Sequence, residues 1–370
     1  MERRLIVEQF DPERPRPGGI DTCIRGLVRY CPPDIDLRIA GVDALGNKRL
    51  GEWRQYEIGG RVVQFMPVAR VDPANLRRRF PHSVLVAFGL RKYRPSPDAD
   101  IVQTHRVNMG ATALGLYSRA GHVQFIHWDG EDEVVSGSES YFRRAVFAYR
   151  RLETYVVPRS VETVVFNKAG AERLQSISPR VRFSPTWYDP VEFFPAESEP
   201  PVKSRILWAC RIDQGKNPSL AIDVLTALPP RYSLTVAGSG TLESAMRDRA
   251  QASPAAERIA FLGAVPKAEM GAVMREHDLM LMTSRSEGFS RSIVEGLASG
   301  LPVVTAAAAE PNGLVQNGVN GARVEGHATH KFVPAVEIAS AISAKAARDS
   351  VSALSALRVV PDVLSLGGAK

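Results

Sequence analysis

The chain has 370 residues, of which 44% are hydrophobic and 24% are charged, and this composition is typical of a globular protein with more than one domain. Its three cysteines, Cys23, Cys31 and Cys210, are too few and too scattered for a disulfide framework or for the spacing of a zinc site, so we expect a reducing, cytoplasmic environment. The apolar run Leu5-Ile6-Val7 is too short for the core of a signal peptide, and no stretch reaches the roughly 18 apolar residues of a membrane span.

The net charge of +7 permits an anionic partner, and its distribution indicates where one could bind. The segment from Arg70 to Arg94 carries seven basic residues against Asp72 alone, with Phe80, Phe88 and Tyr93 among them. Such a segment could lie on an anionic membrane surface, or it could be a solvated face that attracts phosphate. No signature of an RNA- or DNA-binding module accompanies the charge, so we expect no nucleic-acid partner.

The first half of the chain alternates short apolar runs with helical patterns. Strands are predicted at 5–10, 37–42, 62–68, 84–90, 101–104, 122–128, 163–166 and 181–183, and helices at 20–30, 109–120 and 141–156. This alternation predicts an α/β fold with a parallel, doubly wound sheet, whose ligands bind at the carboxyl ends of the strands.

Several residues with a possible role in binding occupy such strand ends. Gly18 and Gly19 come directly before the first helix, where the missing side chains let a backbone approach a ligand closely. They do not form the longer glycine fingerprint of dinucleotide-binding folds, which argues against a dehydrogenase. His105 and His127 each come at the end of a predicted strand, and Asp129 follows two positions later. A histidine in such a place is either a structural hydrogen bonder or a catalytic group, and Asp129 could bind a substrate hydroxyl.

A polar, proline-bearing stretch at 196–201 separates the two halves, and the same alternation then starts again. A strand at 205–210 is followed by a loop with Arg211 and Lys216 and by a helix at 219–228. The arginine offers a planar fork and the lysine a mobile point charge, so both could reach a diphosphate. A strand at 233–237 then runs into the glycine turn Gly238-Ser239-Gly240, and the stretch 335–347 is predicted to be helical.

The most informative stretch follows a predicted buried strand at 278–282. The turn Glu287-Gly288-Phe289-Ser290 leads into a helix at 293–299 that Gly300 caps. The backbone amides of the turn and the N-terminus of the helix favour a phosphate there, and Glu287 and Glu295 can accept hydrogen bonds from sugar hydroxyls. A ligand that offers both a phosphate and neutral hydroxyls is a nucleotide sugar.

Glu287 and Glu295, with Gly288-Phe289 between them and Gly300-Leu301-Pro302-Val303-Val304 after them, resemble the Glu-x7-Glu element of retaining GT-B glycosyltransferases of family 4, the group 1 glycosyltransferases. The resemblance implies two Rossmann-like domains that face a cleft. These would be an acceptor-binding domain over 1–195 and a nucleotide-sugar-binding domain over 196–347, with the tail 348–370 as a candidate for packing back on the first. The implied reaction transfers a hexosyl group, with retention, from a UDP- or GDP-sugar to a hydroxyl of a saccharide or lipid-linked saccharide, in polysaccharide or glycolipid biosynthesis.

The resemblance also implies roles for particular residues. It makes His127, Arg211, Lys216 and Glu287 the expected catalytic residues. The residues expected to bind the donor nucleotide sugar are Gly18, Gly19, Gly238, Ser239, Val265, Gly288, Phe289, Ser290 and Glu295. Asp129 and His105 are the candidates for acceptor binding. The chain departs from the family pattern at Cys210, which replaces a glycine, and at Thr186-Trp187, where Asn-Gly is usual.

No Asp-x-Asp type of acidic cluster stands out, so we expect a metal-independent reaction with no cofactor, in which Arg211, Lys216 and backbone amides stabilise the leaving diphosphate. Two alternatives stay open: a nucleotide-sugar epimerase or phosphorylase with the same fold, and a non-catalytic scaffold that docks on anionic membranes through Arg77 to Tyr93. The basic segment favours, as a hypothesis, a cytoplasmic protein that is peripheral on the inner face of a membrane. The choice between UDP and GDP is not determined by the sequence.

Overall fold

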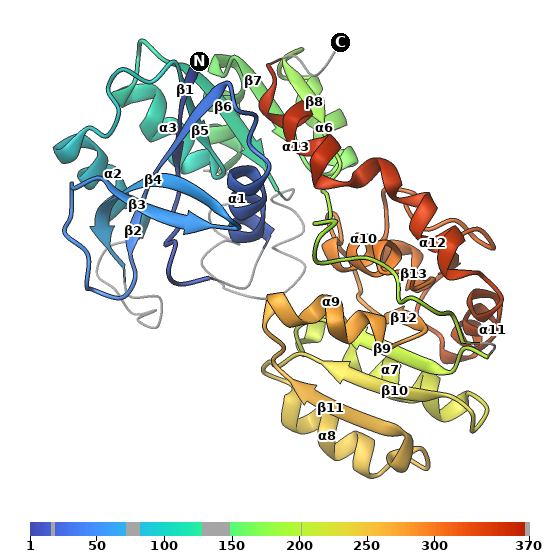
Figure 1. The fold of residues 1–370 in the computed structure, drawn as a ribbon. Coiled ribbons are helices and arrows are strands. Elements are labelled where there is room, and N and C mark those ends of the chain that lie inside the picture. Colours follow the sequence, from blue (N-terminus) through green and yellow to red (C-terminus); the bar gives the residue numbers. More distant parts are fainter. Residues whose placement is uncertain (16–18, 72–81, 128–148, 201, 367–370) are drawn as a thin grey trace. The chain divides into compact units, whose positions relative to one another are not determined.

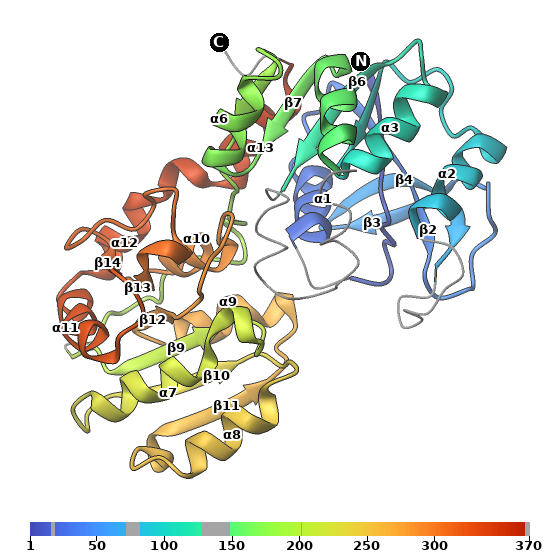
Figure 2. The ribbon, with the colours of Figure 1, turned by 180° about the vertical axis from the view of Figure 1, so that it is seen from behind.

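The computed structural model describes residues 1–15, 19–71, 82–127, 149–200 and 202–366. They form two compact units (Figure 1, Figure 2). The first unit contains the described residues up to 184 together with 360–366, and the second contains those from 185 to 359. The chain therefore returns to the first unit near its end.

The first unit is built on an eight-stranded sheet with the order β3-β4-β2-β1-β5-β6-β7-β8. The strands are β1 (Glu2–Val7), β2 (Ile35–Asp43), β3 (Arg54–Ile58), β4 (Arg61–Arg70), β5 (Ile101–Thr104), β6 (Gly121–Ile126), β7 (Glu162–Val165) and β8 (Val181–Phe183). All neighbouring strands are parallel except β3 and β4, which form an antiparallel hairpin. The hairpin turns at Gly59 and Gly60, whose φ angles of 58° and 80° suit a tight two-residue loop. β3 was not predicted from the sequence.

Helices cover both faces of this sheet, with α1 on one face and α2 and α3 on the other (Figure 1, Figure 2). The helices are α1 (Gly19–Arg29), α2 (His82–Tyr93), α3 (Val107–Leu116) and α6 (Lys168–Gln175), with a 3₁₀ turn η1 (Val157–Arg159). Residues 149–156 are also helical, and the rest of the helix predicted at 141–156 lies outside the described residues. On α1 the buried residues Ile20, Cys23, Ile24, Leu27 and Val28 follow the helical period, which explains why this helix packs on the sheet.

The strand predicted at 84–90 is wrong, because this run lies within helix α2. A short apolar run fits a buried strand and a buried helix equally well, and here only Val86, Gly89 and Leu90 are buried, at the spacing of one helical face. Gly89 allows the helix to approach β4 closely, since a Cβ at this position would lie 2.0 Å from the carbonyl oxygen of Val68.

The second unit has a six-stranded sheet of parallel strands with the order β11-β10-β9-β12-β13-β14. Its strands are β9 (Arg205–Ala209), β10 (Ser233–Ala237), β11 (Ile259–Gly263), β12 (Leu279–Met282), β13 (Val303–Ala306) and β14 (Gly321–Val324). Its helices are α7 (Pro218–Ala227), α8 (Glu243–Gln251), α9 (Lys267–Arg275), α10 (Arg291–Ala298), α11 (Thr329–Ser340) and α12 (Ala344–Ser350). The single helix predicted at 335–347 is wrong, because Ser343 caps a new helix by accepting a hydrogen bond from the amide of Ala346.

The last helix, α13 (Ala356–Leu364), contains the point at which the chain passes back into the first unit. Within that unit, Arg4 Nη2 donates to the carbonyl oxygen of Leu364 at 2.7 Å, and Arg182 Nη1 lies 3.2 Å from Asp362 Oδ2. At the other crossing, the chain joins the second unit from Pro185 onward, and Phe193 is fully buried in a core cluster of that unit. The sequence prediction put this boundary later, after 195.

The buried His122 on β6 generates a prediction about stability in acid. Its ring nitrogens lie 2.9 Å from Thr104 Oγ1 and 2.9 Å from Ser160 Oγ, and burial lowers its pKa from 6.5 to about 4. Between these two values the unfolded chain takes up a proton that the folded protein does not, so the free energy of unfolding should fall as the pH falls through this window. The cost is roughly 1.4 kcal/mol per unit of pKa difference.

We expect His122→Gln to flatten this acid dependence, because glutamine can bond to both hydroxyls without titrating. The measurement is the free energy of unfolding of both proteins by denaturant, above and within the window. An equal loss of stability in both proteins would assign the acid sensitivity to other groups.

Candidate functional site

The topology of the second sheet brings two of the predicted loops together. β9 lies in the sheet between β10 and β12. From β9 the chain continues to β10 on one side, and from β12 it continues to β13 on the other side. β9 and β12 are parallel, with Ile206 opposite Leu279 and Leu207 opposite Met280. The loops that follow them therefore share one edge, which is where open α/β sheets bind ligands. Arg211 and Lys216 follow β9, and Glu287 follows β12.

Lys216 and Glu287 form an ion pair at this edge, between Nζ and Oε1. Ser284 Oγ also donates to Glu287 Oε1 at 2.9 Å. The two loops are further joined where Thr283 Oγ1 donates to the carbonyl oxygen of Lys216 at 2.9 Å and the amide of Arg285 donates to that of Gly215 at 2.8 Å. The cation and the carboxylate are thus held side by side by the backbone as well as by their charges.

Arg211 is placed differently, because its side chain is 71% exposed and its Nη2 lies 3.5 Å from Asp213 Oδ2. An exposed ion pair of this length contributes little to stability. The guanidinium can therefore turn toward an anionic ligand at low cost, as the sequence prediction requires.

The turn at Gly238 packs directly on the loop of Arg211. Gly238 has a φ of +153°, and a Cβ there would lie 2.0 Å from the carbonyl oxygen of Cys210. The amide of Ile212 donates to the carbonyl oxygen of Ser239 at 3.0 Å, and the amide of Gly238 donates to that of Gly263 at 2.7 Å. Val265 follows this contact by two residues and packs against the same apolar cluster as Phe289. Ser239 is exposed at the turn.

The turn before α10 is attached to a loop whose role the sequence left undefined. Asn312 Nδ2 donates to the carbonyl oxygen of Gly288 at 2.8 Å. The buried carboxylate of Glu310 accepts hydrogen bonds from the amides of Asn312 and Val315, both at 3.1 Å. Ser290 is the N-cap residue of α10, and its side chain makes no capping hydrogen bond. The amides of the first turn are thus available to a ligand.

Glu295 lies on α10, and its carboxylate is 4.0 Å from Lys267 Nζ on α9. Lys267, Ser284 and Asn312 were not singled out from the sequence. Lys267 and Asn312 come from other loops and helices than the two glutamates, whereas Ser284 precedes Glu287 by three residues in the same loop. The predicted residues Arg211, Lys216, Gly238, Ser239, Val265, Gly288, Phe289, Ser290, Glu287 and Glu295 all lie within the second unit.

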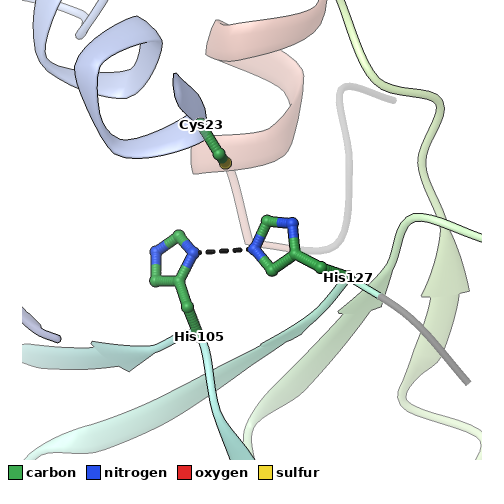
Figure 3. A group of neighbouring side chains, drawn as sticks. All are labelled: Cys23, His105 and His127. Atoms are coloured by element: carbon green, nitrogen blue, oxygen red, sulfur yellow. Dashed lines mark hydrogen bonds between the residues drawn. The ribbon is translucent and has the colours of Figure 1, made fainter. Parts of the chain in front are cut away.

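The first unit brings together a second group of predicted residues. Its sheet has β1 between β2 and β5, and His105 and His127 follow the neighbouring strands β5 and β6. His105 Nδ1 lies 2.9 Å from His127 Nε2, and the two rings are stacked at an angle of 14°. Cys23 on α1 points at the same pair (Figure 3). Cys23 was not predicted to belong to a site, since its partners lie far away in the sequence.

His105 is buried, and both its burial and the neighbouring Arg106 lower its pKa to about 3, so its ring is neutral at physiological pH. Among the residues that the structure describes, Cys23, His105 and His127 form the group whose donor atoms, all within 4.8 Å of one another, could hold a metal ion. The two histidine nitrogens are closer than the roughly 3.3 Å expected between two nitrogens bound to a tetrahedral zinc ion. Their 2.9 Å separation fits a hydrogen bond instead.

Of the remaining predicted residues, Gly19 begins α1, and a Cβ at this position would have no atom within 4 Å. A side chain at position 19 would therefore meet no atom of the described part of the chain. Gly18 and Asp129 lie outside the described residues.

Residues 192–350 match the family model of glycosyl transferases group 1. This segment is a group 1 glycosyl transferase domain. The family match confirms the resemblance to group 1 glycosyltransferases, and the predicted residues from Arg211 to Glu295 all fall within the matched segment. The chain is also similar over part of its length to D-inositol 3-phosphate glycosyltransferases. That of Mycobacterium marinum is 29% identical over 141 residues, 37% of this chain, and that of Corynebacterium glutamicum is 30% identical over 135 residues, 34% of this chain. The matched parts span only 30% and 32% of the length of these relatives.

Solved structures resemble the chain over nearly its whole length. The sucrose-phosphate synthase of Thermosynechococcus elongatus superposes with a TM-score of 0.79 at 14% identity, covering 98% of this chain and 97% of that one. HepE of Anabaena, solved in complex with UDP-glucose, superposes with a TM-score of 0.70 at 15% identity, covering 98% of each chain. At such low identity the likeness shows the fold alone. Together with the two units, whose sheets are parallel except for the β3–β4 hairpin, it confirms the expected α/β fold of GT-B type.

The close packing at Gly238 predicts that Gly238→Ala destabilises the glycosyl transferase domain. The added Cβ meets the carbonyl group of Cys210, and the backbone conformation is unfavourable for alanine, so we expect a loss of at least about 1 kcal/mol in the free energy of unfolding. Gly215→Ala in the adjacent loop is the matched control, because a Cβ there meets only Asp213 Oδ1 at 3.4 Å. Denaturant unfolding measures both variants, and equal stability of the two would refute the steric argument.

Proposed function

We propose that the protein is a glycosyltransferase that moves a hexosyl group from a nucleoside-diphosphate sugar to a hydroxyl of a saccharide or lipid-linked saccharide, with retention at the anomeric carbon and without a metal cofactor. The observation that carries this proposal is the pairing of Lys216 with Glu287 at the ligand-binding edge of β9 and β12, inside a group 1 glycosyl transferase domain.

The donor is assigned from the chemistry of that edge. Lys216, Arg211 and the amides before α10 offer positive charge and hydrogen-bond donors to a diphosphate, while Glu287 and Glu295 offer acceptors to the hydroxyls of the sugar and the ribose. In the structure the charge of Lys216 is matched by Glu287. A bound diphosphate would take over Lys216 and release a carboxylate oxygen of Glu287 for a sugar hydroxyl. The complex of HepE with UDP-glucose supports UDP as the nucleotide of choice for the first test.

The reaction then requires little covalent chemistry from the protein. The bond between the anomeric carbon and the diphosphate oxygen breaks, and its electron pair stays on that oxygen. The acceptor oxygen bonds to the anomeric carbon on the same face, and its proton passes to the departing phosphate. Lys216, Arg211 and the backbone amides stabilise the negative charge that grows on the leaving group, which is the task a metal ion performs in other transferases.

A specific observation favours peripheral attachment to an anionic membrane as an additional property. Helix α2 exposes Phe88, whose side chain is 68% accessible, and exposes Arg91 and Lys92 three and four positions later, on the same helical face. An exposed aromatic ring beside basic groups suits the interface of an anionic bilayer. The described residues contain no helix that is long and apolar enough to cross a membrane. Residues 72–81 of the basic segment, with Arg77, Arg78 and Arg79, lie outside the described residues.

We expect Lys216→Ala to lower kcat for glycosyl transfer by about 10²–10³-fold, the usual effect of removing one group that stabilises developing negative charge. Lys345→Ala is the matched control, because this lysine of the same unit is exposed and pairs with its neighbour Asp349 on α12. Transfer from UDP-, GDP- and ADP-sugars is measured with and without EDTA and in the absence of phosphate, which separates a transferase from a phosphorylase. Unchanged turnover in Lys216→Ala would favour a different site or a non-catalytic role.

Nucleotide binding is measured on the same proteins by thermal unfolding. A nucleotide at 100 times its dissociation constant should add about 2.7 kcal/mol to the stability of the wild type, and less to that of Lys216→Ala. Stabilisation that persists in EDTA is the expected result. Stabilisation that EDTA abolishes would contradict the metal-independent proposal.

The membrane proposal is tested by sedimentation with vesicles. Replacing Arg91 and Lys92 by glutamate should weaken binding to anionic vesicles by about 2 kcal/mol or more, roughly 30-fold, since each basic residue near such a surface contributes about 1 kcal/mol. Replacing the exposed Lys331 and Lys345 by glutamate changes the net charge equally and is the control. Equal binding of the wild type to anionic and neutral vesicles would contradict the proposal.

A further inference from the structure

A chain of hydrogen bonds runs through the core of the first unit and ends at His127. Arg4 Nη1 on β1 donates to Gln103 Oε1 on β5 at 3.3 Å, and Gln103 Nε2 lies 3.0 Å from His105 Nε2. His105 Nδ1 in turn lies 2.9 Å from His127 Nε2. Arg4, Gln103 and His105 are all at most 2% exposed, so water does not compete for these contacts.

The chemistry of Arg4 fixes the direction of every bond in this chain. A guanidinium only donates, so the amide oxygen of Gln103 must face Arg4 and its NH₂ group must face His105. An NH₂ group also only donates, so His105 Nε2 accepts and the neutral ring carries its proton on Nδ1. That proton is donated to His127 Nε2, and a neutral His127 therefore carries its own proton on Nδ1.

Arg4 cannot easily turn away from this arrangement, because it is held from two further sides. Its Nε donates to Glu2 Oε1 at 2.7 Å, and its Nη2 donates to the carbonyl oxygen of Leu364 on α13 at 2.7 Å. A second proton on His127 would sit on Nε2 and face the N–H group of His105, donor against donor. The chain of hydrogen bonds thus disfavours both the charged form of His127 and its other neutral tautomer.

We propose that Gln103 and His105 are positioning residues for the transfer reaction: they hold His127 neutral with its proton on Nδ1, so that His127 meets the sugar substrates as a hydrogen-bond donor to an oxygen and not as a base. The link to transfer rests on the proposed function, whereas the state of the rings does not. The nearby thiol of Cys23 suggests an opposite arrangement, a thiolate paired with a charged imidazole, and the same experiment decides between the two (Figure 3).

The experiment is two-bond ¹H–¹⁵N NMR of the full chain labelled with ¹⁵N-histidine, in which each ring nitrogen shows whether it carries a proton. The chain has seven histidines, and single substitutions assign their signals. We expect both His105 and His127 to show a proton on Nδ1 and a bare Nε2 at neutral pH. A proton on Nε2 of either ring, or a charged ring, would overturn the proposal.

Gln103→Glu tests the donor-to-acceptor direction of these hydrogen bonds. A carboxylate only accepts, so His105 Nε2 should gain a proton. Gln64→Glu is the control, because it adds the same charge on β4, three strands away from β5, and should leave the ring signals unchanged. Arg4 can neutralise the new carboxylate, which favours folding of the variant. A bare Nε2 on His105 in folded Gln103→Glu would overturn the proposed direction. Should this variant not fold, the spectrum of the wild type still decides.

His105→Phe tests the positioning role, since phenylalanine preserves the stacking on His127 but has no N–H group. We expect His127 to lose its single tautomer and kcat/KM for transfer to fall roughly tenfold, about the effect of one hydrogen bond. His330→Phe, on α11 of the other unit, is the control. Unchanged transfer despite an altered His127 signal would overturn the positioning role. A wild type with the expected ring states but no transfer activity would instead refute the proposed function.

Discussion

The structure depends on one constraint: strands that are distant in the sequence pair side by side and in parallel in each sheet. Because parallel strands run in the same direction, their carboxyl ends meet at one edge of the sheet, and long crossovers connect them. At β9 and β12 this places the loop of Lys216 beside the loop of Glu287, and at β5 and β6 it places His105 beside His127. Both groups of candidate residues exist because the crossovers bring distant loops to the same edge.

Within that arrangement, charge is balanced before any ligand binds. A lysine and a carboxylate at the edge of a sheet are both costly to desolvate alone, and pairing Lys216 with Glu287 reduces that cost. The pair also suits the proposed ligand, because a nucleotide sugar supplies an anion for the lysine and hydroxyl donors for the glutamate. Binding would therefore exchange one set of partners for another and leave neither charge unmatched.

In the first unit, the need to satisfy buried polar groups has a further consequence. Buried donors and acceptors must find partners, and Arg4, Gln103 and His105 satisfy one another in a single chain. Because an arginine cannot accept a hydrogen bond, the direction of this chain is determined at β1 and transmitted to His127. The hydrogen bonds that stabilise this core therefore also set the protonation of His127, the residue proposed to touch the substrate.

The sequence by itself determined the α/β alternation and the residues of the glycosyl transferase domain, because those signals are local: the spacing of Glu287 and Glu295, the glycines beside them, and the basic pair after a strand. It did not determine whether the run 84–90 is a strand or a helix, since only packing on β4 decides which face of an apolar run is buried. The tertiary structure alone brought Cys23, Lys267 and Asn312 to the candidate residues, and Arg4 to Gln103. These contacts join elements far apart in the chain, and no periodicity of the sequence encodes which loops the crossovers will bring together.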